Sequence, residues 1–201
     1  MRLDSVPKIL LKDIASIRTG VVTSRKRATF DCQSAYEYKL LNLHCIRNDG
    51  KLDISSAEPF YANEKLNEDF ITKPNDILIR LSAPYSSAII EQESTNLLVP
   101  SHFAIIRLTK SSINPYFVLW QLRQKNAMQL IYRNISGTIQ FGTINSGLFA
   151  NLPIKCLAEE RQNSFGKLFK LTEKEQELLT RLASEKAKLN RALMAHAFMN
   201  F

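Results

Sequence analysis

The acidic residues that come nearest to a metal-dependent nuclease site are Asp76, Glu91 and Glu93. Such a site needs clustered carboxylates to hold the metal ions and, in the common pattern, a lysine two residues after one of the acids. No lysine follows any of the three at that spacing. Asp76 also ends a turn sequence, residues 73–76 (Lys-Pro-Asn-Asp), which accounts for it without a site. The pattern therefore argues against a stand-alone nuclease.

The other reactive side chains are also poorly placed for catalysis. His44 and Cys45 are adjacent, which would point them to opposite faces of a strand, and no second pair of zinc ligands exists. Ser101 and His102 have no acid nearby to orient the histidine, so they do not predict a hydrolase. Residues 114–117 resemble the Asn-Pro-Pro-Tyr/Phe tetrapeptide of amino-methyltransferases, but the second proline is missing. We expect no catalytic residue, no metal and no cofactor, and a binding module rather than an enzyme.

Three polar loops carry side chains that suit a DNA duplex, which needs cations for its phosphates and amide or guanidinium groups for its base edges. They are the basic triplet 25–27, the turn 80–87, and segment 136–143 with a basic residue shortly before it. An ordinary solvated loop is the alternative explanation for each. The residues that we expect to contact DNA are Arg25, Lys26, Arg27, Arg80, Tyr85, Arg133, Thr138, Gln140 and Thr143.

The charge of the chain also points to a polyanionic partner. Lys and Arg number 27 against 19 Asp and Glu, a net charge of +8. Residues 1–158 hold 19 basic and 13 acidic residues, and residues 159–201 hold 8 and 6. Segment 94–158 contains no acid at all, and its basic residues are Arg107, Lys110, Arg123, Lys125, Arg133 and Lys155. We expect this segment to form a face of positive potential.

Length and composition fit a folded, intracellular chain. The 201 residues suffice for one globular domain with an appendage, and 45% of them are hydrophobic. No apolar run approaches the ~18–20 residues that cross a bilayer, and the N-terminus lacks a secretory signal. The three cysteines are too few and too scattered for a disulfide framework. We therefore expect a cytoplasmic location and no membrane partner.

The first ~157 residues mix short strands and short helices, which predicts an α+β domain. Apolar runs rich in Ile, Leu and Val predict strands, Asn48-Asp49-Gly50 predicts a tight turn, and Asn114-Pro115 predicts a capped helix start. The expected strands are 36–47, 52–54, 77–81, 88–90, 97–99, 103–108 and 152–154. The expected helices are 12–17, 63–70 and 114–133.

Beyond Ala158 the composition changes to Glu, Lys, Leu and Ala, which predicts one long helix over 158–201. An imperfect heptad register, interrupted by Glu175, Glu185 and His196, gives it an apolar seam. At 1.5 Å per residue such a helix is ~60 Å long, more than its domain can cover. A helix broken near Gly166 and folded back is the alternative that we disfavour. The seam residues expected to contact a second copy or a methyltransferase are Leu171, Leu178, Leu182, Leu189 and Ala192.

In order along the chain, several segments resemble one half of a type I restriction–modification DNA specificity (S) subunit. Each motif is short, but their order and spacing cover nearly the whole chain. One departure lies at the start of the long helix, where Ala158 replaces a proline and Arg161 stands where the family has glutamine. The matching segments are 11–20, 75–80, 100–108, 114–118, 148–154 and 189–201.

This resemblance implies a target recognition domain, residues 1–157, joined to a spacer helix, residues 158–201. It implies a subunit without catalytic activity of its own, which directs adenine-N6 methyltransferase subunits and a restriction subunit to a split site in double-stranded DNA. A single recognition domain and a single helix imply a half-length subunit that forms a homodimer through its helices. The alternative function is a protein-only adaptor or decoy that binds a methyltransferase subunit.

Overall fold

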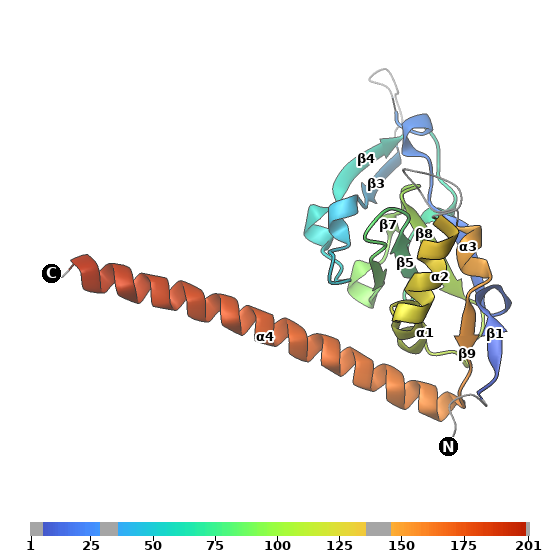
Figure 1. Cartoon of the computed structure of the whole chain (residues 1–201). Helices are drawn as coiled ribbons and strands as arrows, with labels where there is room; N and C mark the ends of the chain where they lie inside the picture. The colour runs from blue at the N-terminus through green and yellow to red at the C-terminus, as the bar shows by residue number, and fades with distance from the viewer. Residues whose placement is uncertain (1–5, 29–35, 136–145, 200–201) are drawn as a thin grey trace.

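The computed structural model describes residues 6–28, 36–135 and 146–199, with the side chains of residues 133–135 left out. Its centre is an antiparallel four-stranded sheet with the order β2-β8-β5-β6 (Figure 1). A second sheet has the order β4-β3-β7, and β1 pairs with β9. The strands are β1 (Lys8–Leu10), β2 (Ala15–Thr19), β3 (Tyr36–Leu40), β4 (Glu58–Ala62), β5 (Ile77–Arg80), β6 (Ser87–Ile89), β7 (Leu97–Leu98), β8 (Phe103–Leu108) and β9 (Pro153–Lys155).

Short helices cover one side of the central sheet, and a long C-terminal helix projects from the domain (Figure 1). The α-helices are α1 (Pro115–Leu122), α2 (Lys125–Ile135), α3 (Gly147–Ala150) and α4 (Glu159–Met199). Short 3-10 helices in the connections are η2 (Leu11–Asp13), η3 (Thr23–Arg25), η4 (Leu43–Cys45), η5 (Ile54–Ser56), η6 (Glu68–Phe70) and η7 (Gln92–Ser94). The predicted α+β class with a long C-terminal helix is confirmed.

The apolar run of β5 is explained by burial on both of its faces. Ile77 and Ile79 pack into the core beneath α1 and α2, whereas Leu78 packs with Phe103 and Ile105 into a second core on the other face. Successive strand residues point to opposite faces, so a strand between two cores must be apolar at every position. The central sheet is therefore fixed from both sides, and its strand ends are rigid supports for the loops that leave them.

Three expected helices differ in the structure. Of residues 12–17, only the first part forms the short η2, because Ala15 onward pairs with β8 in a five-residue register. Segment 63–70 is extended apart from η6, since the backbone N–H of Leu66 donates to the Tyr38 hydroxyl instead of to a helix carbonyl. The helix expected over 114–133 is divided into α1 and α2 at Arg123, whose side chain turns inward to bind other elements.

The C-terminal helix is continuous over 41 residues. The alternative of a break near Gly166 is therefore wrong, because this glycine lies within α4 and is buried against the N-cap of α1. The helix passes below α1 and then projects beyond the domain (Figure 1). From Leu178 to Met199 every described residue of α4 is exposed. The domain thus covers only the first part of the helix.

Candidate nucleic-acid interface

Two of the predicted DNA-binding loops leave the same edge of the central sheet. β2 and β5 are each antiparallel to β8, so they run in the same direction. Their ends are level, because Thr19 and Ile79 both pair with Ala104. Ser146 also lies at this edge, where its Oγ accepts a hydrogen bond of 2.9 Å from the Thr19 hydroxyl. We call this side of the sheet the loop edge.

The basic triplet lies beyond β2, next to β4. Arg25 is exposed and has no ion-pair partner among the described residues. Lys26 forms an ion pair with Glu64, and the guanidinium of Arg27 lies 5.2 Å from the ring centroid of Phe60. Two of the three cations are thus held in place while remaining at the surface, which suits them to positioning a phosphate backbone.

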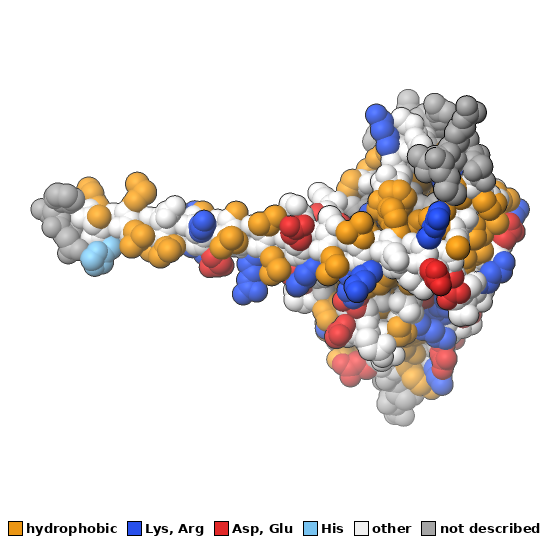
Figure 2. Space-filling view, turned by 90° about the horizontal axis from the view of Figure 1, so that it is seen from below, with side chains coloured by type: hydrophobic (Ala, Val, Ile, Leu, Met, Phe, Trp, Pro, Cys, Tyr) orange, Lys and Arg blue, Asp and Glu red, His pale blue; other side chains and the backbone are white. Residues whose placement is uncertain are grey.

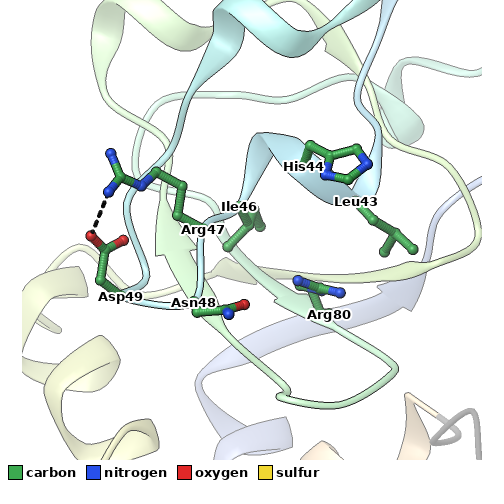
Figure 3. Close-up of a pocket in the computed structure, with 7 residues that line it drawn as sticks. All are labelled: Leu43, His44, Ile46, Arg47, Asn48, Asp49 and Arg80. Carbon is green, nitrogen blue, oxygen red and sulfur yellow. Dashed lines mark ion pairs between the residues drawn. The ribbon is translucent and has the colours of Figure 1, made fainter.

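Arg80 ends β5 and lines a surface pocket of about 480 Å³, which we call the Arg80 pocket (Figure 3). The other side of the pocket comes from η4 and the 46–52 hairpin, where Ile46 pairs with Leu52. The predicted Asn48-Asp49-Gly50 turn is confirmed, with Gly50 at a φ of +81°. The residues lining the pocket are Leu43, His44, Ile46, Arg47, Asn48, Asp49 and Arg80.

Tyr85 is not at the surface. It is only 7% exposed, belongs to the core beneath α1 and α2, and packs edge-on against Tyr132 at 5.4 Å. Burial raises the pKa of its hydroxyl. Its backbone has a φ of +57° within the turn that connects β5 to β6. This placement contradicts the expected DNA contact and leaves Tyr85 a packing role.

The remaining predicted DNA contacts belong to the segment around 133–143. The backbone of Arg133 lies in the last turn of α2. Thr138, Gln140 and Thr143 lie outside the described residues. The four therefore stay predictions.

Two basic residues of the acid-free segment 94–158 are paired with acids from outside it. Arg107 makes a two-pronged ion pair with the buried Asp76, at 2.8 Å and 2.7 Å, and its Nη2 also donates to the Ile71 carbonyl. These hydrogen bonds to Asp76 raise the pKa of Arg107. Arg123 pairs with Glu173 of α4 at 2.7 Å. The acids are thus distant in sequence and adjacent in space, and they neutralise two of the six basic residues of this segment.

The same pairs account for the acids closest to a nuclease pattern. Asp76 is neutralised by Arg107, and Glu91 pairs with Lys170 at 2.7 Å. Within residues 6–28, 36–135 and 146–199, no group of three or more His, Cys, Asp and Glu side chains is placed to hold a metal ion. The two carboxylates act instead as structural partners of basic side chains.

α4 is held to the domain by Arg123 on one side. Its guanidinium donates to the carbonyls of Gly50 (2.8 Å) and Ser87 (2.6 Å) and pairs with Glu173. The same guanidinium lies 5.6 Å from the ring centroid of Phe169. One side chain thus connects the 46–52 hairpin, the edge strand β6 and α4, which fixes the direction in which the helix leaves the domain.

The first turns of α4 lie against the N-terminus of α1. Gln162 is buried and accepts a hydrogen bond from the Asn114 backbone N–H, while the Asn114 side chain donates to Asn163. Phe165 packs edge-on against Trp120, with ring centroids 4.4 Å apart. Gly166 allows this approach, because a Cβ there would lie 2.3 Å from the Asn114 side-chain oxygen.

The predicted leucines of α4 face away from these contacts. Leu168 and Leu171 are each two residues beyond a docked position, Gly166 and Phe169, which turns them about 200° around the helix. Leu171, Leu178, Leu182 and Leu189 are 51–58% exposed. Figure 2 shows hydrophobic side chains spaced along the projecting part of the helix, and Ala192 is exposed in the same stretch. The domain cannot cover this leucine face.

Three residues that line the Arg80 pocket were not among the predicted DNA contacts: His44, Arg47 and Asn48. The sequence signal was present, since a basic residue directly precedes the Asn-Asp-Gly turn. Only the pairing of Ile46 with Leu52 and the position of β5 bring that turn beside Arg80.

Three solved structures with similar folds come from type I restriction–modification systems. One chain, from a study of complex assembly and conformational transition of such a system, has a TM-score of 0.62, is 15% identical, and covers 95% of this chain and 44% of that one. The HsdS subunit from Thermoanaerobacter tengcongensis has a TM-score of 0.58 at 14% identity, covering 90% and 40%. The S subunit from M. genitalium has a TM-score of 0.56 at 14% identity, covering 91% and 43%.

No protein-family model and no curated protein matches the sequence. The chain spans less than half the length of each of the three solved chains. In the described part of the chain, no helix is long and apolar enough to cross a bilayer. The chain has the fold of the type I restriction–modification specificity subunits over nearly its full length.

Proposed function

We propose that the chain is a sequence-specific DNA-binding module of a type I restriction–modification system. In this proposal it lacks catalytic activity and directs an adenine-N6 methyltransferase subunit, and with it a restriction subunit, to a split DNA site in the cytoplasm. The observation that carries the proposal is the fold itself, a recognition-type domain joined to a long helix with a bare leucine face.

The DNA surface of the proposal is the loop edge. Arg25, Lys26, Arg27 and Arg80 lie there on loops supported by β2 and β5. Cations on loops fixed by a rigid sheet favour backbone contacts that set the register of a duplex, with base readout added by amide and hydroxyl groups. Arg133, Thr138, Gln140 and Thr143 remain proposed contributors to that readout.

The protein surface of the proposal is the leucine face of α4. Exposed leucines at heptad spacing are typical of helices that pair with other helices. Because the face begins at Leu168 and turns away from the domain, we infer that its partner is a helix outside the described residues. A second copy, paired antiparallel through a two-fold axis, would place two recognition domains at opposite ends of the helices and so read a symmetric split site. The methyltransferase subunit would bind the same arm.

The decisive experiment is co-expression of the chain with an adenine-N6 methyltransferase subunit of the same organism, followed by mapping of the methylated adenines. We expect methylation at a two-part motif that appears only when the chain is present, and a complex mass that contains two copies. Methylation that is unchanged by omitting the chain would contradict the proposal.

Duplex binding by the purified chain separates the proposal from the protein-only adaptor. A specificity module shows an affinity for DNA whose logarithm falls linearly with the logarithm of salt concentration. An adaptor or decoy shows assembly with the methyltransferase and no salt-dependent binding to the duplex.

A further inference from the structure

We propose that the Arg80 pocket binds a phosphate group of the DNA backbone, through the Arg80 guanidinium with help from Asn48 and His44. This inference rests on the proposed function, because it assigns a ligand to one place on the loop edge. None of His44, Arg47 and Asn48 belongs to the contacts expected from the sequence.

The guanidinium of Arg80 has hydrogen-bond donors without a protein acceptor in the described part of the chain. Among the described residues, its Nε is the one buried side-chain nitrogen or oxygen without a hydrogen-bond partner. The guanidinium makes a single long hydrogen bond of 3.5 Å, from Nη2 to the Ala83 carbonyl. A guanidinium carries five N–H donors and is always charged, so a half-buried one is normally paired. The Nε is buried, so the Nη groups of this pocket-lining side chain are the donors that can meet an acceptor from outside the domain.

The other half-buried arginines show what a structural role looks like in this protein. Arg107 has a two-pronged carboxylate partner and a carbonyl, and Arg123 has a carboxylate and two carbonyls. Both are therefore satisfied within the described part of the chain. Arg80 is also half-buried, but no acid among the described residues lies at ion-pair distance from it. This difference separates a ligand-binding arginine from a packing one.

The rest of the pocket complements a phosphate. In Figure 3, the amide of Asn48 lies level with the guanidinium of Arg80, and His44, Leu43 and Ile46 lie above them in the view. An amide and an imidazole can each donate to a phosphate oxygen, and the guanidinium supplies the fixed fork that suits it. The aliphatic side chains give the sugar an apolar wall.

The one carboxylate that lines the pocket is already occupied. Asp49 accepts hydrogen bonds from the Lys51 backbone N–H at 3.1 Å and pairs with Arg47 at 3.4 Å. Figure 3 shows this pair at the side of the pocket away from Arg80. The charge that meets a ligand at the centre is therefore that of Arg80.

The pocket is also held in a fixed shape. The Gly50 carbonyl is anchored by Arg123, and the Asn48 carbonyl lies 3.5 Å from the Ser86 hydroxyl. Arg80 itself is tied to the turn by a 2.9 Å hydrogen bond from its backbone N–H to Ser86. A preformed site loses little freedom on binding, and its place at the end of β5 puts it on the same edge as the basic triplet.

The test measures the binding of the full chain to a 30-base-pair duplex by fluorescence anisotropy over a range of salt concentrations. Removing one phosphate contact lowers the magnitude of the slope of log affinity against log salt by about 0.9. It also weakens binding by about the same factor for every duplex, whatever the base sequence. We expect this for Arg80→Gln. The matched control is Lys110→Gln, which removes one exposed charge just beyond β8, at the opposite end of the sheet, and leaves the slope unchanged.

Asn48→Ala keeps the test decisive if thermal melting shows that Arg80→Gln does not fold. Asn48 is exposed and neutral, so its loss weakens binding to every duplex without changing the slope. A change confined to particular base sequences, in either variant, would mean a base contact and overturn the phosphate assignment. Equal slopes for wild type, Arg80→Gln and Lys110→Gln would also overturn it, while leaving the proposed function intact.

Inorganic phosphate distinguishes the two possible sources of the phosphate group. If millimolar phosphate raises the melting temperature of wild type but not of Arg80→Gln, and duplex binding is the same for both, the pocket takes a free phosphate and the duplex assignment fails. If the wild-type chain shows no salt-dependent duplex binding at all, the proposed function itself fails.

Discussion

The two faces of α4 differ in chemistry and in what covers them. The docked face presents Gln162, Phe165, Gly166 and Glu173, each of which contacts the domain. The opposite face presents leucines at heptad spacing. The described part of the chain leaves each of these leucines more than half exposed. One helix thus carries a specific, polar attachment to its own domain and a general, apolar surface for another helix.

A domain can thus fix the direction of a long helix while it covers only the first turns of that helix. Amide, aromatic and ion-pair contacts are directional, so they fix the angle of the helix. A leucine stripe is not directional, but it supplies most of the free energy of helix pairing by burial. Disrupting the two faces should therefore have different consequences, which the following predictions separate.

The largest effect is expected on the leucine face. Replacing Leu178 and Leu182 by Asp removes about 3–6 kcal/mol of favourable burial free energy from each chain of a helix pair. The dissociation constant of the pair should therefore rise about a hundredfold or more. The melting temperature of the domain should stay within a few degrees, because both residues project beyond it. Analytical ultracentrifugation checks the assembly, and the exposed Lys186→Asp is the control for charge. Unchanged self-association would show that this face is not the dimer surface.

Arg123→Met is the largest expected change on the docked face. It leaves Glu173 and the Gly50 and Ser87 carbonyls without their charged donor, which should cost about 1.5–3 kcal/mol of unfolding free energy. The distribution of distances between spin labels on the domain and on the end of α4 should broaden, because the helix loses its contact with Arg123. Arg181→Met, on the exposed part of α4, is the matched control and should change neither measurement. A narrow distance distribution in Arg123→Met would mean that the α1 contacts suffice.

Gly166→Leu tests the close approach of α4 to α1. Any side chain there meets the Asn114 side chain, which caps α1 by accepting from the Phe117 N–H at 3.1 Å. Overpacking should cost about 1–3 kcal/mol, lowered in part by the better helix propensity of leucine. Urea unfolding measures the loss, with the exposed Lys167→Leu as the control. Equal stability of the two variants would show that α4 shifts to accept the side chain.

The smallest effect is expected from the exposed cluster of Glu91, Tyr116 and Lys170. Hydrogen bonds from Lys170 and then Tyr116 hold the pKa of Glu91 below its ordinary value, and Glu91 raises the pKa of Lys170. The stabilisation is therefore full between the ordinary pKa values of the two groups, and it is lost as pH falls through the folded-state pKa of Glu91 or rises above the ordinary lysine range.

Because this cluster is solvent-exposed, its contribution should be below about 1 kcal/mol. Thermal unfolding of wild type and Lys170→Met across pH checks the prediction. The two curves should differ near neutral pH and converge in acid. A constant difference at every pH would place the contribution in packing and not in charge.

Local patterns predicted much of the fold because they act over short distances. The Asn114-Pro115 helix start, the Asn-Asp-Gly turn, the strands of the two cores and the continuous α4 all follow from side chains within a few residues of each other. The helices expected over 12–17 and 63–70 failed for the opposite reason. Their backbone groups are satisfied by β8 and by Tyr38, partners that lie far away in sequence.

The candidate DNA contacts divide in the same way. Arg25, Lys26, Arg27 and Arg80 lie on the loop edge, and their contacts with DNA stay predictions. Tyr85 lies in the core instead, packed against Tyr132, which is distant in sequence.

The sequence by itself determined the α+β class, the long C-terminal helix and its leucine seam, because heptad spacing and turn residues are local properties. It also determined the net charge of +8. Only the tertiary structure decided where that charge acts. Arg107 and Arg123 are consumed by Asp76 and Glu173, whereas Arg80 is left with free donors beside a hairpin 30 residues earlier in the chain. Which charges neutralise each other depends on which side chains are close in space. That proximity is set by strand pairing and helix docking, not by order along the chain.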